Sequence, residues 1–161
     1  PRHSAVGKVY LYRILRAKEL PPMSRQYVCF IEEHKPFDAG LLKRIAALLE
    51  GEHDFRSFSP RLEEGENPVK TIWHAGVTED QSLIEVRFVG SGFLYQMVRR
   101  MMGLLIAIAG GRETEETLRN ALEEPSKGSV KYNASPKGLF LDRVVYSQEE
   151  LEQVLNESVG S

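Results

Sequence analysis

The sequence predicts an α+β fold, in which a layer of antiparallel sheet is covered by helices. One observation is a set of stretches in which apolar and polar residues alternate, the period of a β-strand. Another is a set of stretches with apolar residues three and four positions apart, the period of a helix. They follow the order strand, helix, hairpin, helix, helix, strand, helix, which suits a sheet packed against helices. With 161 residues, 42% of them hydrophobic, we expect one domain over residues 1–161 with a sizeable core.

The first strand is expected over residues 6–18, because apolar and polar residues alternate there and a pair of prolines closes it. Tyr10 and Tyr12 fall together on one face of this strand. The apolar residues assigned to the other face are Val9, Leu11 and Ile14. A short apolar run at residues 27–31 fits either a strand or a helical turn.

The first helix is expected to open at Asp38, as its N-cap, and to close at Gly51, as its C-cap. Its apolar stripe consists of Leu41, Leu42, Ile45, Leu48 and Leu49. Residues 51–59 follow as a compact turn. We expect the two phenylalanines of this turn, Phe55 and Phe58, to dock under the domain.

An acidic loop and a hairpin come next. Residues 61–68 are acidic and interrupted by Gly65 and Pro68, so we expect a mobile surface loop. Residues 69–78 and 83–90 both alternate between apolar and polar side chains. Together they predict two strands of an antiparallel hairpin.

The chain is organised around a helix predicted from Gly92 to a stop at Gly110-Gly111. Its apolar stripe consists of Phe93, Met97, Met101, Leu104, Leu105 and Ile108. The opposite face carries Gln96, Arg99, Arg100, Gly103 and Ala107. Because small residues let another backbone come close, we expect the helix to be sandwiched, with Arg99 at the contact. The alternative is a core helix whose arginines extend to solvent.

The remaining elements complete the α+β pattern. Thr114 opens a second helix, with Glu116 and Thr117 behind it, which ends before Pro125. The segments after it are an irregular stretch at 130–135, a turn at 136–138, a strand at 139–146 and a helix at 148–155 capped by Ser147.

Composition limits the chemistry. The net charge of −2 means that any surface for nucleic acid must be a local patch. Cys29 is the only cysteine, which excludes a disulfide framework and suits a reducing cytoplasm. The histidines have neither the i, i+4 spacing nor the neighbouring cysteines that are typical of a metal site. They are His3, His34, His53 and His74. No signal peptide opens the chain, and the uncharged run at 101–111 is far shorter than the roughly 20 residues that span a membrane.

An arginine and two tyrosines form the best candidate site. Tyr10 and Tyr12 share a strand face, and Arg99 lies on a helix that must pack near the sheet. A tyrosine ring can stack on a base, and an arginine can hold a carboxylate or a phosphate, which is a common combination on RNA-binding sheets. Half-exposed tyrosines on an ordinary strand are the plainer interpretation.

Four stretches carry a resemblance to a known family. They are Gly7-Lys-Val-Tyr-Leu-Tyr-Arg-Ile14, Leu49-Glu-Gly-Glu-His-Asp-Phe-Arg-Ser-Phe58, Gly92-Phe-Leu-Tyr-Gln-Met-Val-Arg-Arg-Met-Met-Gly103, and Ser135-Pro-Lys-Gly-Leu-Phe-Leu141 with Val144-Val-Tyr146. In order and spacing they resemble the C-terminal half of the tRNA pseudouridine synthase A family. They cover most of the chain from Ser4 to Tyr146. The chain departs from the family around Thr71-Ile72, where members often carry an arginine in the strand; here Lys70 precedes the pair.

The resemblance implies a ferredoxin-like or RRM-like half of a pseudouridine synthase fold. It also implies a cofactor-free isomerase that converts uridines of the tRNA anticodon stem-loop. In that family an aspartate of an Arg-Thr-Asp-x-Gly motif is the nucleophile. Tyr10 would stack on the flipped base, and Arg99 would pair with the aspartate and keep it ionised.

The motif that carries the nucleophile is absent from this sequence. None of the aspartates follows an Arg-Thr pair: Asp38, Asp54, Asp80 and Asp142. The chain also starts at Pro1 without a methionine. We therefore expect it to be a piece of a longer polypeptide whose N-terminal half supplies the nucleophile, and to be inactive alone.

The expected partners are tRNA, the missing half and a second copy of the chain, since the resemblance implies a homodimer. Gly103 and Ala107 would stay small so that the missing half can approach. The face that they share should then be open or covered by a neighbouring copy. The alternative functions are a non-catalytic RNA-binding module and a dimerisation module on the same scaffold.

Overall fold

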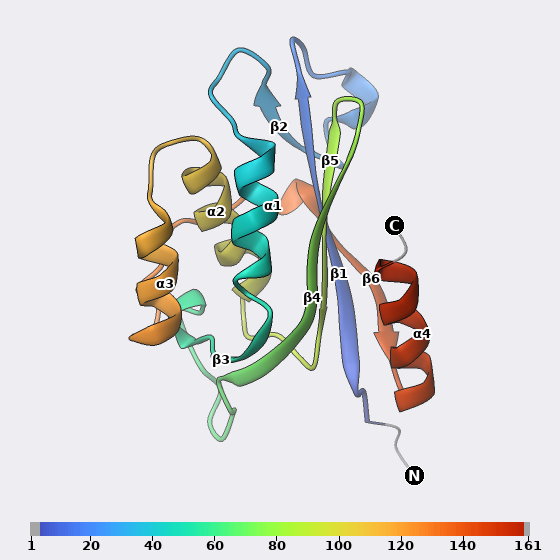
Figure 1. Cartoon of the computed structure of the whole chain (residues 1–161), viewed down its shortest axis with the longest axis vertical. Coiled ribbons are helices and arrows are strands. Elements are labelled where there is room, and N and C mark those ends of the chain that lie inside the picture. The colour runs from blue at the N-terminus through green and yellow to red at the C-terminus, as the bar shows by residue number, and fades with distance from the viewer. Residues whose placement is uncertain (1–3, 160–161) are drawn as a thin grey trace.

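The computed structural model describes residues 4–159 (Figure 1). Its strands are β1 (Gly7–Ala17), β2 (Cys29–Glu32), β3 (Gly51–Asp54), β4 (Val69–Asp80), β5 (Leu83–Gly90) and β6 (Leu139–Val145). Its α-helices are α1 (Ala39–Ala47), α2 (Met97–Ala109), α3 (Glu115–Glu123) and α4 (Gln148–Val159). Single 3₁₀ turns are η1 (Pro22–Ser24), η2 (Arg56–Phe58) and η3 (Pro136–Gly138). The α+β fold is confirmed.

The six strands form one mixed sheet with β1 at its centre. The order is β2-β1-β5-β4-β3, and β6 also pairs with β1. Along one edge of β1 runs the antiparallel β5. On the other edge β6 pairs antiparallel with Gly7–Tyr12, and β2 pairs parallel with Ile14–Ala17. The two short strands therefore lie end to end, and β2 makes the sheet mixed where the sequence predicted an antiparallel one.

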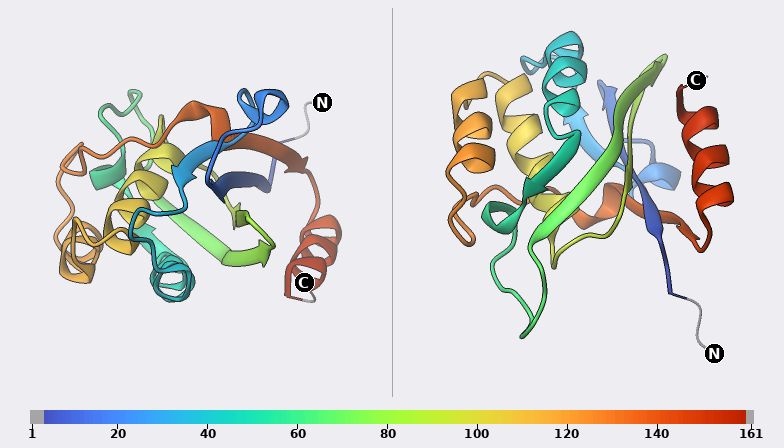
Figure 2. Two further views of the ribbon diagram at one scale, coloured as in Figure 1. Left: turned by 90° about the horizontal axis from the view of Figure 1, so that it is seen from above. Right: turned by 60° about the horizontal axis from the view of Figure 1, so that its bottom comes forward.

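The helices are divided between the two faces of the sheet. α1, α2 and α3 lie on one face and α4 lies on the other (Figures 1 and 2). The main core fills the space between α1, α2 and the sheet, and its large fully buried members include Tyr12, Phe55, Phe58, Phe88 and Met101. A smaller core under α4 consists of Val9, Val89, Val145, Leu151 and Val154. Within residues 4–159 no helix has the length and apolar character to cross a membrane.

The first strand is confirmed, but one side chain was assigned to the wrong face. Ile14 is fully buried in the main core with Tyr12, and Val9 belongs to the core under α4. The reason is the strand period of two, which puts positions 12 and 14 on the same side of the pleat. The ambiguous run at 27–31 is resolved as a strand from Cys29, which pairs with the end of β1.

The helix at Asp38 is confirmed at its start. The Asp38 carboxylate accepts a hydrogen bond from the Leu41 amide at 2.9 Å, as an N-cap does. The helix ends at Ala47, earlier than predicted, and Gly51 instead begins β3 with a φ of +108°. The predicted compact turn is thus β3 followed by η2. Its two phenylalanines are fully buried, as predicted.

The hairpin is also confirmed. β4 and β5 are antiparallel neighbours, and β4 continues to Asp80. The connection is the pair Gln81-Ser82, and Gln81 takes a positive φ of 56°. Such left-handed residues are what a tight two-residue hairpin turn requires.

The central helix is shorter than its pattern predicts. α2 begins at Met97, and Gln96 before it is left-handed with a φ of 59°. Residues 92–95 therefore form a turn, in which the Leu94 carbonyl accepts a hydrogen bond from the Met97 amide at 3.0 Å. Phe93 therefore lies before α2 and is not part of its apolar stripe. Its ring packs against Tyr10 on the sheet instead, with the ring centroids 5.0 Å apart.

The last two helices differ in how they are capped. Thr114 precedes α3 as predicted, but its side chain makes no cap bond. The Glu113 carboxylate accepts hydrogen bonds from the Thr114 amide and the Thr117 hydroxyl instead. Ser147 does cap α4, accepting from the Glu150 amide at 3.1 Å, and α4 continues to Val159.

Candidate functional site

Arg99 lies in the first turn of α2, partly buried, on the side of the helix that faces residues 130–135. Its Nε donates a hydrogen bond to the Ala134 carbonyl at 2.9 Å. The Ala134 amide returns one to the Arg99 carbonyl, also at 2.9 Å. Among residues 4–159 the two terminal nitrogens, Nη1 and Nη2, have no hydrogen-bond partner. The guanidinium is thus held at one end and available at the other.

Residues 130–135 have no regular secondary structure and pack along one side of α2. We call them the 130–135 segment. A Cβ on Gly103 would lie 2.7 Å from both the Asn133 nitrogen and the Tyr132 carbonyl carbon, so only glycine fits there. Arg100 also contacts this segment, because its Nη1 donates to the Val130 carbonyl at 2.8 Å.

This contact overturns one expectation from the sequence. Gly103 was expected to stay small for a missing half or a neighbouring copy, but the chain itself occupies that space. The sandwich around α2 is confirmed, with the 130–135 segment as the covering layer. This covering layer could not be predicted, because the 130–135 segment has neither a helix period nor a strand period.

Tyr12 is fully buried beside this segment. Its hydroxyl donates a hydrogen bond of 2.6 Å to the carbonyl of Ser135. Burial raises the pKa of Tyr12 far above its usual value, and the neighbouring Cys29 thiol raises it further, while the positive charge of Arg99 opposes both. Tyr12 is therefore a permanent hydrogen-bond donor close to Arg99. The plain interpretation of a half-exposed tyrosine is wrong for this residue.

Tyr10 is partly buried on the same face of β1, two residues from Tyr12. Its ring meets Phe93 edge to face, with an interplanar angle of 86°. Its register partner on β6 is Leu141, which is 52% exposed. Burial raises the pKa of the Tyr10 hydroxyl. The ring is thus fixed by aromatic packing next to an accessible apolar side chain.

The structure brings the predicted residues to one face of the sheet in two contacts. Arg99 and Tyr12 meet at the 130–135 segment, and Tyr10 makes its ring contact with Phe93 rather than with Arg99. Sequence reasoning missed the hydrogen-bonding role of Tyr12 and the packing role of Phe93. The one available signal was the spacing of two between Tyr10 and Tyr12, which puts both on the side that α2 covers.

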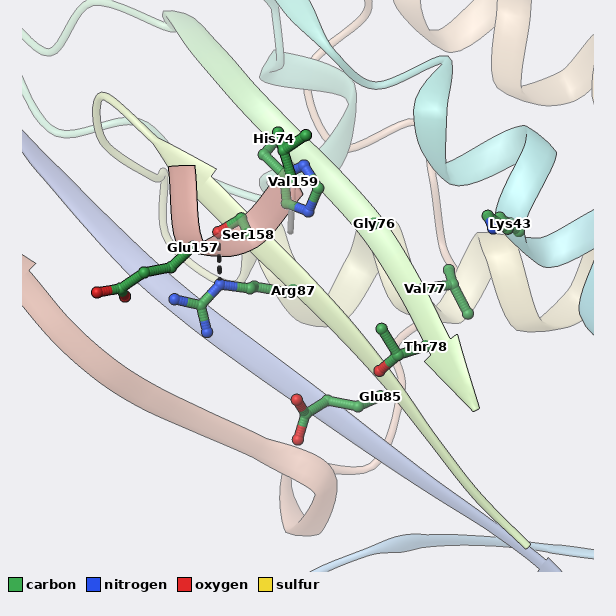
Figure 3. Close-up of a pocket in the computed structure, with 10 residues that line it drawn as sticks. All are labelled: Lys43, His74, Gly76, Val77, Thr78, Glu85, Arg87, Glu157, Ser158 and Val159. Atoms are coloured by element: carbon green, nitrogen blue, oxygen red, sulfur yellow. Dashed lines mark hydrogen bonds between the residues drawn. The ribbon is translucent and has the colours of Figure 1, made fainter. Parts of the chain in front are cut away.

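A cavity of about 490 Å³ lies on the opposite face of the sheet, between β4, β5 and the end of α4 (Figure 3). His74, Thr78, Glu85 and Arg87 line it together with residues of α4. Arg87 is already engaged, since its Nε donates to the Ser158 hydroxyl at 2.8 Å and its Nη1 lies 3.6 Å from Asp142. The cavity contains none of the predicted site residues.

The histidines do not assemble a metal site in the described part of the chain. Among residues 4–159 no three His, Cys, Asp or Glu side chains gather where they could hold a metal ion. His3 lies outside the described residues. His53 contacts the Glu50 carbonyl through Nε2 at 2.9 Å, which is a structural bond at the start of β3.

The fold is a mixed sheet with three helices on one face and one on the other (Figure 2), and Arg99 lies near Tyr12 of the central strand. Comparison with known sequences identifies the family. The family model described as tRNA pseudouridine synthase matches residues 45–147. The chain belongs to this family of isomerases.

Individual relatives match over almost the whole chain. The tRNA pseudouridine synthase A of Staphylococcus aureus strain bovine RF122 / ET3-1 is 31% identical over 150 residues, covering 93% of this chain and 55% of the relative. The tRNA pseudouridine synthase A 1 of Protochlamydia amoebophila is 31% identical over 151 residues, covering 92% of this chain and 58% of the relative. The enzyme of Geobacillus sp. strain WCH70 is 32% identical over 145 residues, 90% of this chain and 58% of its own. The chain thus spans about half the length of the curated relatives that it matches.

Proposed function

We propose that this chain is the C-terminal domain of a tRNA pseudouridine synthase. The complete enzyme would convert uridine to pseudouridine in tRNA, and a preceding half of the polypeptide would bring the aspartate nucleophile. The observation that carries the proposal is the Arg99 guanidinium, anchored through Nε, with both terminal nitrogens available to a carboxylate. The match of the relatives over about half of their length supports the proposed division into two halves.

In the proposed reaction the bond from C1′ of the ribose to N1 of the uracil is replaced by a bond to C5. The aspartate displaces the uracil from C1′, the base turns, and C5 then displaces the aspartate from C1′ and regenerates the carboxylate. C5 loses its proton and N1 gains one. No external oxidant, reductant or group donor is needed for this balance. The chain's own contribution is to orient the reacting groups and keep them charged.

Arg99 is proposed to pair with the incoming aspartate. A cation next to a carboxylate lowers the pKa of that carboxylate and keeps it ionised, and hydrogen bonds to an arginine fix its direction. With Nε already bonded to Ala134, the two remaining nitrogens can hold both carboxylate oxygens end-on.

Tyr10 is proposed to abut the flipped uracil. A base that leaves the stack needs an aromatic or apolar surface to replace its neighbours. Tyr10 offers a ring that Phe93 holds edge to face, beside the accessible side chain of Leu141. The edge-to-face contact with Phe93 supports a stacking or abutting role for the Tyr10 ring.

The activity is tested with the complete enzyme and tRNA that carries tritium at C5 of its uridines. Isomerisation releases the tritium into water, and we expect release with the complete enzyme and none with residues 1–161 alone. If the complete enzyme binds tRNA but releases no tritium, the chain is a non-catalytic RNA-binding module.

The role of Arg99 is tested by Arg99→Ala in the complete enzyme. We expect the single-turnover rate to fall at least a hundredfold while the dissociation constant for tRNA changes severalfold at most. Equal losses in rate and affinity would make Arg99 a phosphate contact.

The assembly and location are also part of the proposal. We propose that the enzyme is a homodimer and that it acts in the cytoplasm. The free thiol of Cys29 suits that reducing compartment. Sedimentation of the complete enzyme measures the association directly, and a monomer at micromolar concentration would contradict it.

A further inference from the structure

We propose that the hydroxyl of Tyr12 is a positioning group for Arg99, acting through the 130–135 segment. The inference rests on the proposed function, since it concerns the aim of Arg99 at the aspartate. It adds a residue that does not touch the substrate. Its action follows a chain of contacts from the core of the domain to the guanidinium.

The first contact joins the sheet to the segment. Tyr12 is fully buried on β1, and its hydroxyl donates to the Ser135 carbonyl at 2.6 Å. A phenylalanine would fill the same space, so the hydroxyl is not required for packing. Because the Tyr12 ring is held by the core, the bond fixes the Ser135 carbonyl relative to the sheet.

The second contact holds the ring of Tyr12 from the other side. The turn η3 closes over it, and a Cβ on Gly138 would lie 3.0 Å from two carbons of the ring and 2.6 Å from the Arg13 carbonyl oxygen. Only a residue without a side chain lets the turn approach this closely. The chain is thus fastened to β1 at Ser135 and again at Gly138.

The third contact joins the segment to Arg99. Ala134 precedes Ser135, and it exchanges two hydrogen bonds of 2.9 Å with Arg99, one with the backbone and one with Nε. The position of the Ala134 carbonyl therefore fixes the orientation of the guanidinium, because it binds the Nε–H. A shift of Ser135 would move this carbonyl and rotate the two free nitrogens away from their target.

The segment has a separate anchor before Ala134. The Tyr132 hydroxyl donates to Glu113 at 3.1 Å, and the backbone of residues 132–133 rests on Gly103. Loss of the Tyr12 hydroxyl therefore leaves the segment attached. We expect it to loosen at Ala134 and Ser135, next to Arg99, without detaching.

The kinetic test uses a double-mutant cycle in the complete enzyme. Tyr12→Phe is expected to lower the single-turnover rate about tenfold or more, with the tRNA dissociation constant within about twofold of wild type. In the Arg99→Ala background the same change is expected to have no further effect on the rate. Tyr146→Phe, at a tyrosine that is 53% exposed, is the matched control and should be silent.

The outcomes separate the two proposals. A wild-type enzyme without activity contradicts the proposed function. The positioning of Arg99 by Tyr12 is then decided by a second test, which needs no activity. An active enzyme in which Tyr12→Phe is silent, or slows the Arg99→Ala enzyme as much as the wild type, overturns the positioning role.

The second test needs no catalysis and uses residues 1–161. Nitrogen-15 NMR of the arginine side chains follows the Arg99 Nε proton, which the bond to Ala134 protects from exchange with water. Tyr12→Phe is expected to speed its exchange at least tenfold while the Arg13 Nε proton, bonded to Glu85, stays unchanged. Unchanged exchange at Arg99, or equal acceleration at both arginines, contradicts the proposal.

Discussion

At the scale of single residues, the site depends on hydrogen bonds that a side chain of similar charge or shape cannot make. Arg99 is the main case. It uses one nitrogen for the Ala134 carbonyl, and the proposed pairing with a carboxylate uses the other two. A guanidinium provides this fixed set of donors, whereas an ammonium is a point charge.

Arg99→Lys is therefore expected to slow the enzyme although it keeps the positive charge. The charge remains, but the lysine cannot bind Ala134 and direct two donors outward, so the rate should fall by about tenfold or more. Tritium release under single-turnover conditions measures it. Arg25→Lys, at an exposed arginine, is the control. A lysine enzyme of near wild-type rate would mean that only the charge matters.

His74 is expected to make the stability of the domain depend on pH. Its ring lies against Gly76, where a Cβ would be 2.5 Å from Nε2. Burial lowers the pKa of His74, the charge of Arg87 lowers it too, and Glu50 opposes both. Because the folded state binds the proton less readily than the unfolded state, His74 contributes stability above its unfolded pKa of about 6.5. That contribution is lost as the pH falls through the folded pKa.

The melting temperature is accordingly expected to fall between pH 7.5 and pH 5. His74→Phe keeps a ring over Gly76 and should make this fall smaller, and His34→Phe, at an exposed histidine, serves as the control. Differential scanning calorimetry across this range gives the comparison. An identical pH dependence in wild type and His74→Phe would refute the assignment.

At the scale of elements, α2 and the 130–135 segment form a unit through Gly103. The segment contacts Arg99, Arg100 and Gly103 on one side of the helix. A methyl group at position 103 would meet backbone atoms at 2.7 Å, and a backbone cannot rotate aside as a side chain can.

Gly103→Ala is expected to destabilise the domain by about 1–3 kcal/mol, because the segment must move away from the helix. The same change should lower activity in the complete enzyme, since Ala134 moves with the segment. Urea unfolding of residues 1–161 measures the first effect. Gly92→Ala is the control, because its Cβ would meet only the Lys70 side chain, at 3.6 Å or more. Equal unfolding free energies for Gly103→Ala and wild type would contradict the tight contact.

The elements with strong periods could be predicted from the sequence. The hairpin of β4 and β5, the start of α1 at Asp38 and the cap of α4 at Ser147 are confirmed. The short strands β2 and β3 could not be predicted, because four residues carry too little alternation and their pairing is set by distant partners. The start of α2 was placed too early, since Phe93 has helical spacing but its ring packs on the sheet.

The site was predictable only in part for the same reason. Its side chains were recognisable because they sit in motifs, as Tyr10 and Arg99 do. The contacts that orient them come from backbone carbonyls of an irregular segment, at Ala134 and Ser135. A carbonyl has no sequence signature, so neither the anchoring of Arg99 nor the role of Tyr12 could be read from residue types.

At the scale of the whole molecule, the sheet separates two cores. The main core lies under α1 and α2 and contains Ile108, and the smaller one lies under α4 and contains Leu151. Among residues 4–159 the buried apolar side chains form two separate clusters, one on each face of the sheet. Substitutions on opposite faces should therefore act independently.

Leu151→Ala is expected to cost about 2–5 kcal/mol and Ile108→Val about 0.5–1.5 kcal/mol. The double variant should lose the sum of the two within about 0.5 kcal/mol. Urea unfolding of the four proteins provides the values. A coupling larger than 1 kcal/mol would show that the sheet transmits packing changes between the cores.

The pairing of β1 with β6 also determines when the domain can complete its folding during synthesis. Residues Gly7–Tyr12 leave the ribosome well before the strand that covers their outer edge, which spans residues 139–145. Until then the edge of β1 is open to any extended chain nearby, and closing a loop of this length makes the pairing slow. In a nascent chain that stalls before residue 139, β6 is not yet present to pair with β1. The turn from Ser135 to Gly138 is then not yet packed over Tyr12. Such chains are the ones that we expect chaperones to hold and proteases to remove.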